Sequence, residues 1–472
     1  MQYAFVKLSL RQFKIILMRK ITTLYLLFFL ISVSIQAQSL RYFDKLFTKV
    51  AVDSNIFYGA NYDYDNLDNQ HGTNLDSLHM DIYYPEGDQE TKRPLIIWVH
   101  GGYFLKGSKL DEDITYFCNE FAARGFVTAA INYRLGFEMP IDSINAVRAV
   151  YRAIQDGRAA VRFLRSKAND YGIDKERVYM GGTSAGSFVA LNLAYFNLPE
   201  EVPDYLDTNE RLSINEKRGF GLDGLEGLTN TIEESSKIQG IININGATKT
   251  VKWMDDAYSS SVPLISLHGT ADSTVPYGTR VINVADVQTE LPKDPPVPLI
   301  GVQGSYDMDW HADTMGYTSR LYTWYGAGHS PHLGYKENDT AKAYLDTIMS
   351  FTVKHIYQDF LGGSTVPGLE ENERPCDYNN GDFYPCKTSS LGEEYQKSSI
   401  ALYPVPMGDE TQFNLPGNVK VDEVWAMDML GRKISLDLIT GNSIDTEKLK
   451  PGNYLILLKT SSGELHRIKA IK

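Results

Sequence analysis

One serine, Ser184, stands among glycines and an alanine in the segment MGGTSAGSFV (180–189), directly after an apolar run. A serine hydroxyl attacks a carbonyl carbon only when a base takes its proton and when no bulky neighbour shields it. Gly182 and Gly186 leave room for a sharp turn between a strand and a helix, so GTSAG fits the G-x-S-x-G pattern of a nucleophile elbow. We therefore expect Ser184 to be a catalytic nucleophile.

Two later segments supply residues that could activate this serine. In HGTADSTVPY, Asp272 follows an apolar strand, where a carboxylate can accept the proton-bearing nitrogen of an imidazole and fix its tautomer. In GAGHSPH, His329 is the expected general base, and His332 is the alternative. His268 lies too close to Asp272 along the chain to be a comfortable third member. The expected catalytic residues are therefore Ser184, Asp272 and His329.

The glycine-bearing segment HGGYF (100–104) follows a second apolar strand and could form an oxyanion hole. We expect the backbone N–H groups of Gly102 and Tyr103, together with that of Ala185, to face the negative charge that develops on the substrate oxygen. Tyr103 stands where a third glycine is common, so its ring must turn away or line the acyl pocket. The alternative is a tight turn that uses its glycines for positive φ.

Short β-rich runs alternate with longer helical patterns from about residue 78 onward. Several of the runs are apolar throughout, as expected of parallel strands whose two faces are covered by helices. This order predicts an α/β fold with a doubly wound, mostly parallel sheet, and helices over 146–170 and after Ser184. The expected strands are 78–84, 94–100, 126–133, 177–182, 238–245, 262–268 and 319–325.

The 472 residues exceed one ordinary domain, and 43% of them are hydrophobic, so we expect two domains. Arg19 and Lys20 precede a short apolar run, which indicates a signal peptide, with a membrane anchor as the alternative and Met18 as an alternative start. Sequence rich in Gly, Pro and Ser after Gly362 indicates a linker, and short strands between turn signals follow it. The expected units are a signal peptide at 1–37, an α/β catalytic domain at 38–361, a linker at 362–398 and a small C-terminal β-sandwich at 399–472.

The net charge of −13 disfavours binding to phosphate backbones, so nucleic acid is not an expected partner. In YDMDWHAD, Asp307, Asp309, His311 and Asp313 have side chains that could hold a metal, but helical spacing spreads them around an axis. A solvated helix face is favoured over a metal site. We therefore expect neither a metal nor a cofactor.

Two features of the sequence leave alternatives open. Residues 199–236 are acidic and poor in apolar periodicity, and they form either a cap over a cleft or a plain surface excursion. Cys376 and Cys386 stand ten residues apart and could form a disulfide after export, with Cys118 as an unpaired buried thiol. Three free thiols are the alternative.

The candidate residues occur in the order Ser184, Asp272, His329, and residues 70–360 resemble the α/β-hydrolase superfamily, close to its carboxylesterase branch. DIYYPEG, FAARGFVTAAINYRLG and DGRAAVRFLRSKANDYGIDKERV are similar to strand and helix segments of that branch. The resemblance implies ester hydrolysis through an acyl-enzyme on Ser184. It leaves the natural ester open.

The C-terminal residues resemble the type A sorting domain of the type IX secretion system found in Bacteroidetes. The matching segments are LYPVP, MLGRKI, LKPGNYLILL and the basic end HRIKAIK, with Val405 where that family usually has asparagine. The resemblance implies export through the periplasm to the cell surface or the medium. It makes the secretion machinery a partner and predicts no stable membrane span in the mature protein. A carbohydrate-binding sandwich is the structural alternative.

Together these features predict a secreted serine carboxylesterase without a cofactor. The expected substrate is a small-molecule or polysaccharide-linked ester, and a carbohydrate acetyl or feruloyl esterase acting on polysaccharide is the alternative within this class. Outside this class, the sequence is also compatible with a serine peptidase of the same fold and with a non-catalytic surface binding protein. The binding protein would require a broken triad, and the sequence lacks none of its members.

Overall fold

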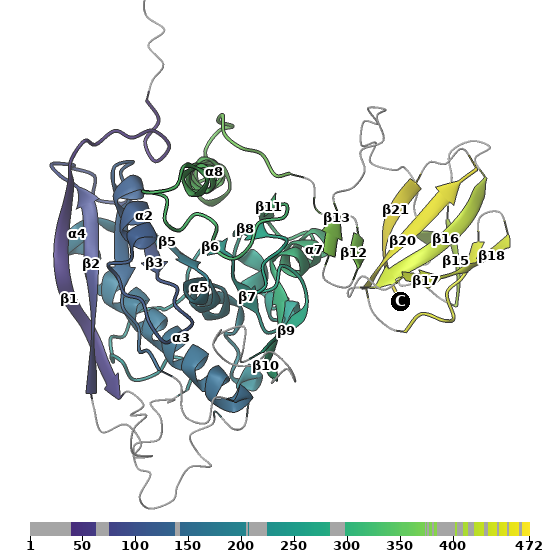
Figure 1. Ribbon diagram of the computed structural model, residues 1–472, viewed down its shortest axis with the longest axis horizontal. Coiled ribbons are helices and arrows are strands. Elements are labelled where there is room, and N and C mark those ends of the chain that lie inside the picture. Colours follow the sequence, from purple (N-terminus) through teal and green to yellow (C-terminus); the bar gives the residue numbers. More distant parts are fainter. Residues whose placement is uncertain are drawn as a thin grey trace, which may run out of the picture.

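The computed structural model describes an α/β part and a C-terminal β part of the chain (Figure 1). Among these residues, every helix is too short or too polar to span a lipid bilayer. The α/β part comprises residues 39–62, 75–136, 142–203, 206, 224–283, 298–372 and 374. The residues described after it are 377–379, 382–384, 402–403, 409–413, 420–428, 433–440, 443–450, 453–461 and 465–472.

An eight-stranded sheet forms the centre of the α/β part. In spatial order its strands are β1 (Val50–Tyr62), β2 (Leu75–Pro85), β4 (Val127–Ile131), β3 (Arg93–Val99), β5 (Ile173–Thr183), β6 (Ile241–Ile244), β8 (Leu264–Gly269) and β11 (Ser319–Trp324). β1 pairs with β2, and β2 with β4, in antiparallel fashion, whereas all the other neighbours are parallel. The predicted mostly parallel sheet is therefore confirmed, and each predicted strand lies within it.

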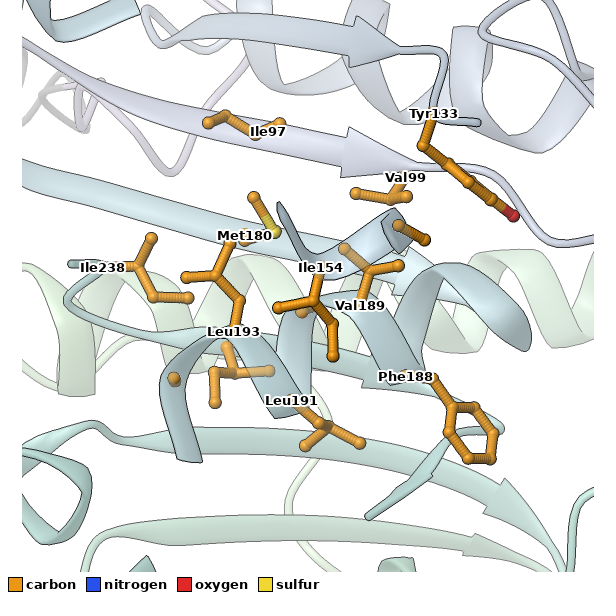
Figure 2. Close-up of a cluster of buried hydrophobic side chains, with 14 of the residues drawn as sticks. Ile97, Val99, Tyr133, Ile154, Met180, Phe188, Val189, Leu191, Leu193 and Ile238 are labelled. Carbon is orange, nitrogen blue, oxygen red and sulfur yellow. The ribbon is translucent and has the colours of Figure 1, made fainter. Parts of the chain in front are cut away.

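Helices cover both faces of this sheet: α3 (Ser143–Ser166) and α5 (Ala185–Tyr195) pack on one, α2 (Glu112–Ala122) and α8 (Asp339–His355) on the other. Successive side chains of a strand point to opposite faces. In β3, Ile97 therefore joins the core beneath α3 and α5, whereas Trp98 stacks on Phe117 of α2. Figure 2 shows the first core, in which Val189 of α5 lies beside Ile154 of α3. Two covered faces explain why these strands are apolar throughout.

Several strands were not predicted from the sequence, and β1 is the longest of them. Its ladder with β2 shifts between Asp53 and Ile56 and again between Phe57 and Gly59. Each irregularity moves the following side chains to the other face, so no regular alternation remains in the sequence. A small sheet of β7 (Ala247–Thr248), β10 (Pro298–Gly304) and β9 (Arg280–Asn283) was also missed. The remaining elements of this part are α4 (Ala168–Tyr171), α7 (Ser305–Met315), η1 (Pro199–Glu201), η4 (Val251–Met254), η5 (Ser259–Ser261) and the π-helix η6 (Ile356–Phe360).

The segment expected to begin the linker is packed against the edge strand β11. The Asn372 side chain accepts a hydrogen bond from the Thr323 N–H at 2.7 Å and donates one to the Thr323 carbonyl at 2.7 Å. The Glu371 carboxylate accepts the Leu321 N–H at 3.2 Å. Side chains thus satisfy backbone groups that an open sheet edge would expose. The chain around residue 372 is therefore held by the α/β part rather than free.

The C-terminal part contains two four-stranded antiparallel sheets, in agreement with the predicted β-sandwich. Val424 and Ile456 of one sheet share a buried core with Ile444 of the other. Cys118 is a free, buried thiol, whereas Cys376 and Cys386 lie outside the described residues. One sheet consists of β14 (Leu402–Tyr403), β15 (Glu410–Phe413), β19 (Ser443–Asp445) and β18 (Asp437–Thr440), and the other of β17 (Lys433–Ser435), β16 (Val421–Asp428), β20 (Asn453–Thr460) and β21 (Leu465–Ile471). A short hairpin of β12 (Asp377–Asn379) and β13 (Asp382–Tyr384) precedes them.

Candidate active site

Ser184 occupies a sharp turn between β5 and α5. Its backbone has φ of 55° and ψ of −117°, a conformation that is costly for a residue with a side chain. The turn is tight, because a Cβ on Gly182 would lie 2.3 Å from the Gly186 carbonyl carbon. A Cβ on Gly186 would lie 2.0 Å from the Val99 carbonyl oxygen at the end of β3. The two glycines of GTSAG therefore permit the turn and its approach to the neighbouring strand.

The structure brings the three predicted catalytic residues together. The Nε2 atom of His329 lies 2.8 Å from Ser184 Oγ, and its Nδ1 atom lies 2.7 Å from Asp272 Oδ2. A carboxylate only accepts hydrogen bonds, so this contact places the imidazole proton on Nδ1. The Nε2 lone pair then faces the serine hydroxyl. The arrangement can remove the hydroxyl proton as the oxygen attacks a carbonyl carbon.

Five hydrogen-bond donors converge on the Asp272 carboxylate. Its Oδ1 atom accepts the backbone N–H groups of Thr274 and Val275, each at 2.9 Å. Its Oδ2 atom accepts from His329 and, at 3.1 Å, from the Asn245 side-chain amide. His268 Nε2 lies 3.2 Å from the same oxygen. Burial alone would raise the pKa of Asp272, but the bonds from His268 and His329 and their charges outweigh it and hold that pKa well below its usual range.

The predicted oxyanion-hole residues lie in two segments that approach each other. A Cβ on Gly101 would lie 3.0 Å from the Thr183 carbonyl oxygen and 3.4 Å from the Ser184 Cβ, so the loop after β3 runs beside the elbow. Gly102 and Tyr103 both have positive φ, of 108° and 59°. Within the described part of the chain, their backbone N–H groups donate to no backbone acceptor. Ala185 is the first residue of α5, so its N–H has no acceptor within the helix. Among the described residues these three N–H groups thus have no backbone acceptor, and the oxyanion hole stays a prediction.

His332, the alternative base, does not contact Ser184. It is fully buried, and its Nε2 atom lies 3.4 Å from Asp113 Oδ2 on α2. The same carboxylate oxygen accepts the Thr183 hydroxyl at 2.9 Å. His332 and Asp113 therefore support the residue that precedes the nucleophile.

The candidate metal ligands in YDMDWHAD contact other side chains around α7. His311 contacts Asp255 at 2.6 Å, Asp307 accepts the Thr279 hydroxyl, and Asp309 accepts the Ser319 hydroxyl. Asp313 is exposed. Among the described residues, no group of three or more His, Cys, Asp or Glu side chains converges as metal ligands.

Thr229 and Asn230 of segment 199–236 pack on the sheet edge formed by β1. The Thr229 carbonyl accepts the Ala60 N–H at 2.9 Å, and the Asn230 side chain donates to the Tyr58 carbonyl at 2.9 Å. Residues 207–223 lie outside the described residues. The cap over a cleft stays a prediction.

Two family models match the chain. Residues 80–282 match BD-FAE, an esterase family with the α/β-hydrolase fold, and residues 401–472 match the Secretion system C-terminal sorting domain. Residues 80–282 form a BD-FAE domain. This domain holds Ser184 and Asp272, whereas His329 lies beyond the matched residues. Both resemblances found in the sequence are thereby confirmed, and the sorting domain is of a kind that directs export.

Several curated esterases are similar to part of this chain. Gut esterase 1 of Caenorhabditis elegans is 29% identical over 112 residues, which are 24% of this chain and 20% of that protein. Fumonisin B1 esterase of Sphingopyxis macrogoltabida is 32% identical over 124 residues, which are 25% of this chain and 22% of that protein. The matched part of this chain thus spans about a fifth of the length of Gut esterase 1. Among solved structures, the apo form of Thermogutta terrifontis esterase 2 is 19% identical with a TM-score of 0.40, and the match covers 70% of this chain and 100% of that chain.

Within the BD-FAE domain, two contacts of Asp272 were not predicted from the sequence, those with His268 and Asn245. His268 stands four residues before Asp272 and was set aside for that reason, yet both lie at the end of β8. Asn245 follows β6, and nothing in the segment IINI that precedes it signals a role. Only the adjacency of β6 and β8 brings Asn245 to the carboxylate.

Proposed function

We propose that the chain is an exported serine carboxylesterase in which Ser184 is the nucleophile, His329 the general base and Asp272 the residue that orients His329. The observation that carries this proposal is the position of His329, whose two ring nitrogens lie within hydrogen-bond distance of Ser184 Oγ and Asp272 Oδ2. The BD-FAE match and the similarity to esterases support the reaction class, and the sorting domain supports export.

In this reaction Ser184 Oγ bonds to the ester carbonyl carbon while its proton passes to His329 Nε2. The carbonyl π electrons move to the oxygen, which the N–H groups of Gly102, Tyr103 and Ala185 stabilise. Collapse of this intermediate expels the alcohol, which takes the proton from His329. Water then attacks the acyl-enzyme with His329 again as the base, and the carboxylic acid leaves. These steps need no cofactor.

We propose that the chain consists of an export signal at 1–37, the hydrolase domain at 38–361, a linker at 362–398 and the sorting domain at 399–472. Segment 199–236 is proposed as a cap. The natural substrate is proposed to be a small-molecule or polysaccharide-linked ester.

The test compares the full chain with its Ser184→Ala variant on p-nitrophenyl acetate, acetylated xylan and methyl ferulate. We expect hydrolysis of at least one ester and a loss of about a thousandfold or more in kcat/KM for Ser184→Ala. Ser166→Ala is the control, because Ser166 is exposed at the end of α3. Equal activity of Ser184→Ala and the unmodified chain would refute the nucleophile, and absence of all three activities would favour a peptidase or a binding protein.

A further inference from the structure

His268 is a buried donor to the carboxylate that orients His329. Its Nε2 atom lies 3.0 Å from the Val275 carbonyl oxygen and 3.2 Å from Asp272 Oδ2, and both oxygens can only accept, so Nε2 carries a proton. Its Nδ1 atom lies 2.8 Å from Ser305 Oγ. Ser305 Oγ accepts the Asn243 side-chain amide at 2.9 Å, which leaves its own hydrogen for Nδ1. His268 therefore directs its Nε2–H at Val275 and Asp272.

Asn245 supplies a second donor to the same oxygen. Its Nδ2 atom lies 3.1 Å from Asp272 Oδ2, and because a carboxylate only accepts, the NH₂ group must face it. The backbone of Asn245 has φ of 56° and donates its N–H to the Leu267 carbonyl at 3.0 Å. Asn245 and His268 are both fully buried. Positive φ is uncommon for a residue with a side chain, and asparagine is among the residues that adopt it most readily.

We propose that Asn245 and His268 are positioning residues for ester hydrolysis, which hold Asp272 Oδ2 toward His329 and set the pH at which His329 becomes the base. This inference rests on the proposed function of Ser184. Two extra donors withdraw negative charge from Oδ2, so the carboxylate stabilises a protonated His329 less than a bare carboxylate would.

The titratable groups around this unit are few among the described residues. Asp272 faces His329 from the loop after β8, and His268 faces Asp272 from β8 itself. Tyr277 lies edge-on to His268 with ring centroids 5.6 Å apart, and its hydroxyl is paired with the Thr323 hydroxyl. Burial raises the pKa of Tyr277 well above its usual value, so it stays neutral across the working pH range.

The sign of the effect follows from this arrangement. Loss of a donor leaves more negative charge on Asp272 Oδ2, and this charge favours the protonated form of His329. Because only the unprotonated form can take the proton of Ser184, activation of Ser184 moves to higher pH. We expect an upward shift of about 0.5 to 1 pH unit, or a rate about 3 to 10 times lower at a pH below both midpoints. A purely structural role would lower the rate at every pH and leave the midpoint in place.

The experiment measures the rate at which a fluorophosphonate probe labels Ser184 of the full chain, between about pH 5 and pH 9. His268→Met removes the donor while keeping bulk, and His268→Gln keeps a donor near the Nε2 position. Asn245→Gly removes the amide and suits the positive φ. Thermal unfolding of each variant checks that it folds, and Asn245→Gly tests the inference even where His268→Met does not fold.

We expect upward midpoint shifts for His268→Met and Asn245→Gly, and the original midpoint for His268→Gln. The inference would be overturned if neither His268→Met nor Asn245→Gly shifted the midpoint, or if His268→Gln shifted it as much as His268→Met. In either case, labelling of the unmodified chain at Ser184 would still support the nucleophile. Absence of labelling at Ser184 in the unmodified chain would overturn the proposed function and this inference with it.

Discussion

Gly186→Ala tests whether the elbow depends on the close approach of α5 to the end of β3. An added Cβ would lie 2.0 Å from the Val99 carbonyl oxygen and 2.8 Å from that of His100. Ordinary contacts begin near 3.4 Å, so the first turn of α5 must move away by up to 3.4 − 2.0 = 1.4 Å. Neither oxygen can yield easily, because both belong to the backbone where β3 enters the loop of Gly102.

The displacement acts on stability and on the reaction separately. Overpacking of this kind costs about 1 to 3 kcal/mol of folding free energy. A shift of about 1 Å in the nucleophile opens its 2.8 Å contact with His329, and misplacement on that scale costs about a hundredfold in rate. We therefore expect a folded variant with a lower melting temperature and a kcat/KM on p-nitrophenyl acetate about a hundred times lower.

Gly328→Ala is the matched control, because it changes the residue next to His329 by the same methyl group. A Cβ there has no neighbour within 4 Å, and Gly328 does not have a left-handed φ. We expect its stability to change by less than about 0.5 kcal/mol and its activity to stay close to that of the unmodified chain. Equal activity and melting temperature of Gly186→Ala and Gly328→Ala would refute the reasoning about the elbow.

Two further predictions concern titration. Burial would raise the pKa of Asp88, but hydrogen bonds from Arg41 and Arg93 and their charges outweigh it and lower that pKa from 3.8 to about 2. This carboxylate therefore stabilises the fold above about pH 4 and loses its contribution as the pH falls toward 2. Asp88→Asn should therefore have a lower melting temperature than the unmodified chain near neutral pH, and this difference should shrink in acid. A difference in melting temperature that does not vary with pH would contradict the stabilising role of the Asp88 carboxylate. Burial raises the pKa of the Cys118 thiol, so iodoacetamide should leave the Cys118 peptide unmodified until the chain unfolds, and mass spectrometry of the native protein would reveal any earlier alkylation.

The parts of the site that follow from local sequence were predictable. Ser184, Asp272 and His329 each follow a predicted strand, and parallel strands end at one edge of a sheet, so motifs distant in the chain were expected to meet. The mostly parallel sheet and the alternation of strands with helices follow from the same pattern. His268 and Asn245 were missed because their role depends on which strands are neighbours, and a single sequence carries no direct signal of that adjacency.

Two further segments differ from what their sequence patterns suggest, for physical reasons. Register shifts in β1 remove the alternation by which an antiparallel strand is recognised. The segment around Asn372 has the composition of a linker, yet its side chains bond the free edge of β11. The composition of a segment indicates whether it can be flexible. It does not show that an edge strand such as β11 lies nearby and can bind it.

The most direct test of the account is whether an acyl group forms on Ser184. The full chain is mixed with p-nitrophenyl acetate, quenched in acid within the first turnover and digested for mass spectrometry. We predict one acetyl group on the peptide that contains Ser184, and none on that peptide in Ser184→Ala. Hydrolysis of the ester without this adduct, or an acetyl group on another residue that survives in Ser184→Ala, would contradict the central claim.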